Sequence, residues 1–266
     1  MPVLSIQSGP VTTVTLDRPD VRNAFNEAVI ADLSAWAGSV PADGSVRVVV
    51  LAGRGPVFSA GADLRWMGRM RDYSHDENLV DARAAARMFQ LIDALPVPVI
   101  ARIQGAALGG GAGLAAVCDI AVAADDAVFG FTEVRLGILP AMISPYVVRR
   151  IGLSAAREWC LTGERFPAST AKAMGLVHAV VPAAALDGEV DRYVQMFMKA
   201  APSAVRRTKA LLHDVAGRRP ADVLALTADA IATQRVSPEG QEGLSAFLEK
   251  RVPAWATDTP PGSTAR

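Results

Sequence analysis

A glycine-rich stretch, GAALGGGAGLAA at residues 105–116, constrains the fold of this chain more than any other feature. Five of its twelve residues are glycine, and it lies between a run typical of a β-strand and a run typical of a helix. Each glycine lowers helix stability by roughly 1 kcal/mol relative to alanine, so the four glycines between Gly109 and Gly113 need a physical reason. Either neighbouring elements pack closely on this backbone, or a ligand lies directly on it.

Apolar periodicity along the chain predicts an α/β fold. Val11–Leu16, Val46–Ala52 and Val99–Ile103 are rich in β-branched and apolar residues, as buried strands are. Between them, residues 79–95 place apolar side chains at helical spacing. The segment 65–78 has no clean period, which predicts an irregular or mobile connection.

The order of these patterns also predicts the domain organisation. Strands alternate with helices until about residue 190, and only helical patterns follow. We therefore expect a core over residues 1–190, a helical region over 191–256 and a disordered polar tail over 257–266.

Composition excludes several classes of protein. Lys and Arg together number 27, as do Asp and Glu, which argues against a nucleic-acid partner. The N-terminus lacks the pattern of a signal peptide, and no apolar run is long enough to cross a membrane. Two cysteines and three widely spaced histidines predict neither a disulfide framework nor a metal site. P-loop, dinucleotide-binding and nucleophile-elbow motifs are absent from the sequence. We expect a cytoplasmic protein without a membrane partner.

Two motifs, FSAGADL (58–64) and LGGGAGL (108–114), each lead from a strand through a glycine-containing loop into an expected helix. Backbone N–H groups at a helix N-terminus are unpaired and carry the positive end of the helix dipole. Two such ends facing each other would place two donors on one oxygen, which is an oxyanion hole. The alternative for either motif alone is close packing of a helix on a sheet.

The sequence resembles the enoyl-CoA hydratase/isomerase, or crotonase, superfamily. The resemblance rests on FSAGADL and on the later run PVIARIQGAALGGGAGLAAVCDIAVAADDAVFGFTEVRLGILP. The resemblance extends from LDRPDVRNAFN (16–26) to EGLSAFLEKR (242–251). It implies a spiral core of ββα repeats, a helical C-terminal trimerisation region, and assembly as a homotrimer or homohexamer. It also implies an acyl-CoA thioester substrate whose carbonyl oxygen accepts hydrogen bonds from two backbone amides. No separate cofactor is implied, since coenzyme A is part of the substrate.

The resemblance assigns roles to particular residues. The N–H groups of Ala62 and Gly110 would form the oxyanion hole. The loop that holds CoA and the basic groups near its phosphates would come from the two N-terminal motifs, with further contacts from the C-terminal region. The residues expected to contact CoA are Ala60, Asp63, Leu64, Arg65, Arg22, Phe247 and Lys250. For Phe247 and Lys250, ordinary packing and solvation is an equally good explanation.

The catalytic acids separate the possible activities. Two-carboxylate hydratases of this family carry one glutamate three residues after the central oxyanion glycine, where this chain has Gly113. The second glutamate corresponds to Glu133, which lies in an apolar stretch. Because charged groups are seldom buried without a purpose, Glu133 is the expected catalytic residue. The alternative is a structural salt bridge to Arg135 or Arg149.

A single glutamate suits a Δ3,Δ2-enoyl-CoA isomerase directly, because one group can remove a proton and return it elsewhere. The run TEVRLGILPAMISPYVVRRIG (132–152) instead resembles bacterial methylglutaconyl-CoA-type hydratases, which also have a small residue at the first glutamate position. On this pattern we expect an enoyl-CoA hydratase. Asp72, Asp76 or Glu77 could supply a second carboxylate. A decarboxylase or a hydrolase could use the same scaffold, and a non-catalytic acyl-CoA-binding homologue could keep both glycine motifs, although Glu133 argues against it.

Overall fold

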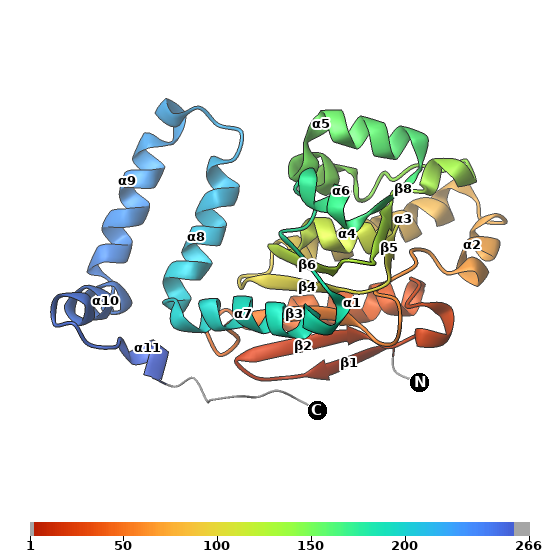
Figure 1. Ribbon diagram of the computed structural model, residues 1–266. Helices are drawn as coiled ribbons and strands as arrows, with labels where there is room; N and C mark the ends of the chain where they lie inside the picture. The colour runs from red at the N-terminus through yellow and green to blue at the C-terminus, as the bar shows by residue number, and fades with distance from the viewer. Residues whose placement is uncertain (1–2, 258–266) are drawn as a thin grey trace.

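The protein, a computed structural model that describes residues 3–257, is built around a six-stranded sheet (Figure 1). The strand order is β1-β2-β3-β4-β6-β9, with β1 antiparallel to β2 and every other pair parallel. All six residues of β3 are buried, as expected for a parallel strand covered on both faces. The strands are β1 (Leu4–Gln7), β2 (Val11–Leu16), β3 (Val48–Gly53), β4 (Val99–Ile103), β6 (Ile120–Ala124) and β9 (Ala179–Val181).

A second, three-stranded sheet contains β5 (Ala106–Leu108), β7 (Val128–Gly130) and β8 (Arg165–Pro167). The chain passes from β4 to β5 and then into α4 (Gly110–Val117), and from β6 to β7 and on to α5 (Ser144–Thr162). In each unit the first strand joins the large sheet and the second joins the small sheet. The expected α/β core of repeated ββα units is thus confirmed.

Three helices from the first half of the chain surround the motif loops. Asn26 caps the N-terminus of α1 (Glu27–Ser39), and its side chain accepts the Val29 N–H. α1 packs on α3 (His75–Asp93), which in turn packs on α4. The face of α3 that packs inward consists of Ala85, Met88, Phe89 and Ile92, all buried.

The expectation of an irregular segment over residues 65–78 is wrong. This segment contains α2 (Leu64–Met70) and the first turn of α3. Ser74 caps α3 by accepting the Glu77 N–H, while the Glu77 carboxylate accepts the Ser74 N–H. This capping box supplies partners for orphan donors and explains why a polar sequence without a clear apolar period is helical here.

The C-terminal part is helical, as expected. α7 (Leu186–Lys199) packs on β3, β4, β6 and β9, and buries Leu186, Val190, Val194 and Met198 in the main core. The expected boundary at residue 190 therefore lies inside a helix that belongs with the core. α6 (Ala168–Ala173) precedes it, and four helices follow it: α8 (Pro202–Val215), α9 (Pro220–Val236), α10 (Pro238–Leu248) and α11 (Ala254–Thr257).

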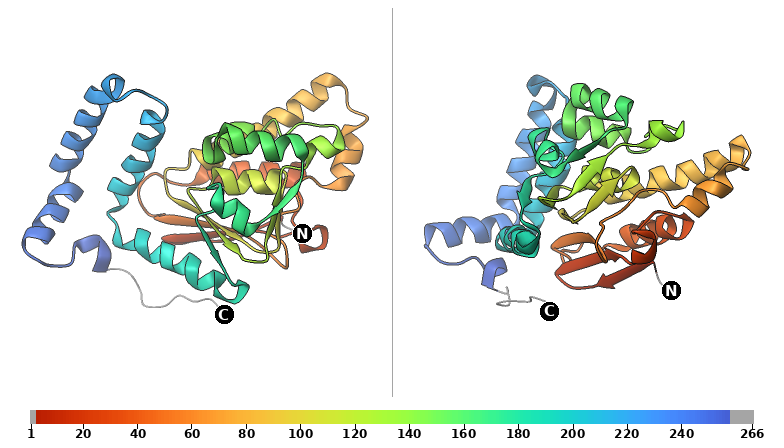
Figure 2. Two further views of the ribbon diagram at one scale, coloured as in Figure 1. Left: turned by 45° about the horizontal axis from the view of Figure 1, so that its top comes forward. Right: turned by 45° about the vertical axis from the view of Figure 1, so that its right-hand side comes forward.

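Helices α8, α9 and α10 extend away from the sheets, on the side of the molecule opposite α2 (Figures 1 and 2). Several large apolar side chains on α9 and α10 are exposed, among them Leu224, Val236, Phe247 and Leu248. Of the tail expected over 257–266, Thr257 ends α11, and residues 258–266 lie outside the described residues.

Candidate active site

The two glycine-containing motifs lie side by side. The Ser59 N–H donates to the Ala106 carbonyl at 3.0 Å, and the Leu108 N–H donates to the Ser59 carbonyl at 3.0 Å. Gly61 has a φ of 90°, and a Cβ placed on it would lie 2.9 Å from the Leu108 carbonyl oxygen and 3.8 Å from the Gly109 Cα. Only glycine combines this backbone conformation with such a close approach.

Pairing with Phe25 fixes the direction of the Ala62 N–H. The Phe25 N–H donates to the Gly61 carbonyl at 2.7 Å, and the Asp63 N–H donates to the Phe25 carbonyl at 2.8 Å. Because successive groups of an extended chain point to opposite sides, the Ala62 N–H points away from Phe25. It has no hydrogen-bond partner within residues 3–257. The Gly110 N–H, at the first position of α4, has no intrahelical partner either.

The Glu133 carboxylate lies against Gly109, the residue before Gly110. A Cβ placed on Gly109 would lie 3.1 Å from Oε1 of Glu133 and 3.6 Å from its carboxyl carbon. Glu133 begins the short 3₁₀ helix η2 (Glu133–Leu136), two residues after Phe131. The Phe131 ring packs against Phe166 with centroids 5.9 Å apart, and this contact anchors the segment from which the carboxylate projects.

The environment of Glu133 is apolar. Its Oε2 atom is buried and has no hydrogen-bond partner in the described part of the chain. Burial raises the pKa of Glu133 above its ordinary value, because a low-dielectric environment disfavours the charged form. A raised pKa makes the Glu133 carboxylate a stronger base than an exposed glutamate, which favours its accepting a proton and then returning it.

The alternative explanation of Glu133 as half of a salt bridge is wrong. Arg135 instead approaches Glu164 at 4.0 Å, and Arg149 pairs with Asp93. The candidate second carboxylates are exposed and have local partners. Asp72 pairs with its neighbour in sequence, Arg71, and Asp76 with His75, while Glu77 belongs to the capping box.

A polar network holds the first motif in place; Asp63 is well placed in the sequence as a helix N-cap, but the role of Arg18 was missed. Arg18 donates to the Ala24 carbonyl at 2.5 Å and to Oδ2 of Asp63 at 2.8 Å. The other Asp63 oxygen caps α2 by accepting the N–H groups of Arg65 and Trp66. Burial by itself would raise the pKa of Asp63, but these hydrogen bonds outweigh it and lower the pKa. The polar residues of LDRPDVRNAFN were the available signal in the sequence.

Both oxygens of the Asp63 carboxylate therefore already accept hydrogen bonds from groups within the protein. The other expected CoA-contacting residues of the N-terminal half gather around the same end of α2. The Ala60 N–H donates to the Arg22 carbonyl at 3.0 Å, and Leu64 and Arg65 are exposed at the start of the helix. The arrangement leaves two exposed cationic side chains, Arg22 and Arg65, beside the loop.

Phe247 and Lys250 do not join this cluster within one chain. Phe247 lies on α10 and Lys250 follows it, at the end of the molecule opposite α2 (Figures 1 and 2). The Phe247 side chain is 81% exposed. The expected contact of these two residues with CoA is thus not made inside a single protomer.

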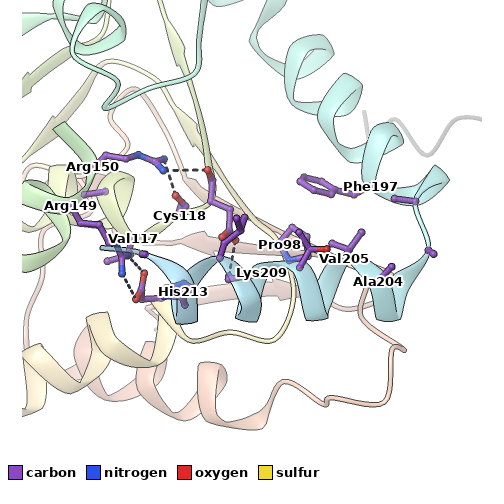
Figure 3. Close-up of a pocket in the computed structure, with 18 residues that line it drawn as sticks. Pro98, Val117, Cys118, Arg149, Arg150, Phe197, Ala204, Val205, Lys209 and His213 are labelled. Atoms are coloured by element: carbon purple, nitrogen blue, oxygen red, sulfur yellow. Dashed lines mark hydrogen bonds and ion pairs between the residues drawn. The ribbon is translucent and has the colours of Figure 1, made fainter. Parts of the chain in front are cut away.

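A cavity of about 580 Å³ lies apart from the motif loops, between α8 and the core (Figure 3). Its charged groups have partners within the protein: Lys209 donates to Asp119 at 2.7 Å, Arg149 pairs with Asp93, and Arg150 donates to the Cys118 carbonyl at 2.9 Å. Phe197 and Val205 contribute apolar wall. Neither Gly110 nor Glu133 lines this cavity, so it is separate from the candidate catalytic residues.

Within residues 3–257, no group of three or more His, Cys, Asp or Glu side chains is arranged to hold a metal ion. No helix in the same range is long and apolar enough to cross a bilayer.

Comparison with known proteins identifies the family of this chain. The sequence model of the family described as enoyl-CoA hydratase/isomerase matches residues 6–258. The chain belongs to the enoyl-CoA hydratase/isomerase family. This membership accounts for the α/β core with its C-terminal helical region, and acyl-CoA thioesters are the substrates on which the family acts.

Solved structures of other members of the enoyl-CoA hydratase/isomerase family superpose on nearly the whole chain. An enoyl-CoA hydratase from Shewanella pealeana is 39% identical, with a TM-score of 0.91, covering 95% of this chain and 96% of the other. Pseudomonas aeruginosa AtuE is 39% identical, with a TM-score of 0.92 and coverage of 96% and 99%. An enoyl-CoA hydratase from Mycobacterium smegmatis is 37% identical, with a TM-score of 0.90 and coverage of 96% and 99%.

Proposed function

We propose that the protein is an enoyl-CoA hydratase that uses a single carboxylate, Glu133. The main support is the position of that carboxyl group. One of its oxygens lies against Gly109, next to the unpaired N–H of Gly110, and the other is buried without a partner. A half-buried acid with a raised pKa, next to the free N–H of Gly110, is suited to moving a proton while negative charge develops on a neighbouring oxygen.

The proposed reaction proceeds in two steps. The Glu133 carboxylate removes a proton from water as the water oxygen bonds to the β-carbon of the enoyl thioester. The electron pair of the double bond moves to the thioester oxygen, and the N–H groups of Ala62 and Gly110 stabilise the resulting enolate. Protonated Glu133 then donates its proton to the α-carbon, which restores the carboxylate and gives the 3-hydroxyacyl-CoA.

In this proposal CoA lies along the N-terminal end of α2. Ala60, Asp63 and Leu64 contribute the loop, with backbone groups at Asp63 because its carboxylate is engaged by Arg18. Arg22 and Arg65 are exposed cations beside the loop, unlike Arg18, which is paired with Asp63, and they suit the CoA phosphates. No cofactor is needed, because CoA is part of the substrate.

The proposal includes assembly as a homotrimer or a pair of trimers. The exposed apolar side chains on α9 and α10 support it, since contiguous exposed apolar groups mark protein–protein contacts. Phe247 and Lys250 would then contact the CoA bound to a neighbouring copy. Light scattering coupled to size exclusion tests this assembly, and a monomer at micromolar concentration would contradict it.

A Δ3,Δ2-enoyl-CoA isomerase is the second candidate. The observation that favours it is the absence of a second carboxylate: the position beside Gly113 is filled by Ile143. In that reaction Glu133 would remove a proton from the α-carbon of a 3-enoyl thioester and return it to the γ-carbon. A non-catalytic acyl-CoA-binding protein would have no use for the buried, unpaired carboxylate of Glu133.

Three thioesters separate these activities: crotonyl-CoA, the branched 3-methylglutaconyl-CoA and a 3-enoyl-CoA. The conjugated enoyl thioester absorbs in the ultraviolet, so hydration removes the absorbance of the first two substrates and isomerisation creates it from the third. We expect hydration of at least one conjugated substrate. Calorimetric binding of all three without turnover would contradict a catalytic role.

A further inference from the structure

Gly113 lies on α4 three residues after Gly110, and residues at this spacing share one side of a helix. A Cβ placed on Gly113 would overlap the Cγ2 methyl of Ile143 and would lie 3.0 Å from the Ile143 Cβ. It would also lie 3.2 Å from Cε1 of Phe89. The volume into which a side chain at position 113 would project is therefore already occupied.

This volume adjoins the candidate catalytic residues. The Phe89 ring that contacts the Cβ position of Gly113 also lies 3.8 Å from the Cβ position of Gly110. The two Cβ positions therefore contact neighbouring atoms, Cε1 and Cζ, on the same edge of the Phe89 ring. The Glu133 carboxylate lies at Gly109, one residue before Gly110. A group beside Gly113 would therefore face the same reaction centre from the next turn of α4.

Ile143 is held firmly in place. It precedes the first turn of α5, where its carbonyl accepts the N–H groups of Tyr146 and Val147. Its side chain is 2% exposed, and a β-branched side chain has few accessible rotamers. The Phe89 ring packs against Tyr146 with centroids 6.3 Å apart, which leaves Ile143 little room to move aside.

We propose that Ile143 is a specificity-determining residue: by filling the space beside Gly113, it keeps a second carboxylate and its bound water out of the site and leaves all proton transfer to Glu133. Gly113 and Ile143 act as a steric pair, in which the absent side chain on α4 is matched by a bulky one from α5. The inference builds on the proposed enoyl-CoA chemistry, because it explains why that chemistry would use one acid.

The first test measures the steric pair independently of activity. Gly113→Ala should lower the melting temperature by several degrees in the wild-type background, since the new methyl group overlaps Ile143. The same change should cost clearly less in an Ile143→Ala background, which removes the overlapping Cγ2 methyl and leaves only the contacts at 3.0 and 3.2 Å. Ile143→Val is the matched control, because valine retains the Cγ2 methyl that fills the space, and Gly113→Ala should remain damaging there. Equal effects of Gly113→Ala in all three backgrounds would overturn the proposal.

The second test introduces the missing acid. The double variant Gly113→Glu/Ile143→Ala should hydrate crotonyl-CoA at least about tenfold faster than the matched Gly113→Gln/Ile143→Ala variant. This threshold lies well below the 10²–10⁴-fold that a positioned acid or base contributes. The pH profile of kcat/KM should gain a second ionisation, which a purely structural effect would not produce. Gly113→Glu alone should be unstable.

A further variant keeps the test decisive if that double variant does not fold. Ile143→Glu places a carboxylate in the same space from α5 and leaves Gly113 unchanged. Ile143→Glu should hydrate crotonyl-CoA at least about tenfold faster than Ile143→Gln. One result would overturn the role proposed for Ile143 but leave the proposed hydratase function standing. In it, the stability coupling is present and the wild type hydrates enoyl-CoA, but no added carboxylate raises the rate. If no variant and no wild-type sample turns over any enoyl-CoA, the proposed function fails, and the specificity role fails with it.

Discussion

Replacing Glu133 with glutamine should abolish turnover and at the same time stabilise the protein. The two side chains have nearly the same shape, but glutamine carries no charge and cannot transfer a proton. A positioned acid–base group contributes 10²–10⁴-fold to rate, so we expect kcat to fall by about that factor. Each tenfold loss corresponds to about 1.36 kcal/mol in the activation barrier. Binding of the CoA thioester should change little.

The expected gain in stability follows from the unpaired oxygen. Oε2 of Glu133 is buried without a partner, and burying an unsatisfied polar group costs about 1–3 kcal/mol, more if it is charged. Glutamine keeps the polar atoms and removes only the charge, so we expect stabilisation of about 1–2 kcal/mol at neutral pH. For a chain of this size, that raises the melting temperature by about 2–8 °C.

The sign of the pH dependence is fixed by the raised pKa of Glu133. The folded protein binds the proton of the Glu133 carboxyl group more tightly than the unfolded chain does. The stabilisation that comes from protonated Glu133 is therefore fully present below the ordinary pKa of 4.5, and it is lost as the pH rises through the folded-state pKa. The stability difference between the Glu133→Gln variant and the wild type should therefore vanish at acid pH and grow toward neutral pH. By the same shift, kcat/KM of the wild type should decline on the acid side at a pH above 4.5.

Differential scanning calorimetry and stopped-flow absorbance on the active substrate measure the two effects. Glu164→Gln is the matched control, because Glu164 is exposed and pairs only loosely with Arg135, at 4.0 Å. It should change neither rate nor melting temperature. A Glu133→Gln variant with the wild-type kcat, or with a lower melting temperature at neutral pH, would refute the reasoning.

Three more predictions concern the surroundings of the site. Gly110→Ala should lower both kcat/KM and the melting temperature, because the new Cβ would lie 2.7 Å from the ring of Phe25; kinetics equal to wild type would contradict the close packing. Arg18→Met should destabilise the fold by about 2–3 kcal/mol in urea unfolding, because it leaves the buried Asp63 carboxylate without its cation, and Arg18→Lys should recover part of the loss. Burial and the charge of Arg150 lower the pKa of His178, so its contribution to stability should be fully present above pH 6.5 and should fall as the pH drops below it. His178→Asn should weaken this pH dependence in melting curves. An unchanged dependence would show that His178 is not its source.

Most of the fold was predictable from local sequence patterns. The buried parallel strands were recognisable as continuous apolar runs, and the two glycine motifs each marked a strand leading to a helix N-terminus. The segment 65–78 was predicted wrongly because its helices are specified by end-capping, at Asp63 and at Ser74 with Glu77, and not by apolar period. The boundary expected at residue 190 lies within α7, because the apolar face of this helix is specified locally but its packing on the large sheet is not.

That two glycine loops present backbone donors and that one glutamate lies in an apolar stretch is readable from the amino acids alone, because these properties depend on residue type and immediate neighbours. What surrounds these groups depends on the three-dimensional packing. Gly61 lies against Leu108, Glu133 projects toward Gly109 without an arginine partner, and Ile143 fills the space beside Gly113. Each of these contacts joins segments that are distant along the chain, so it depends on how sheets and helices pack, which no local pattern encodes.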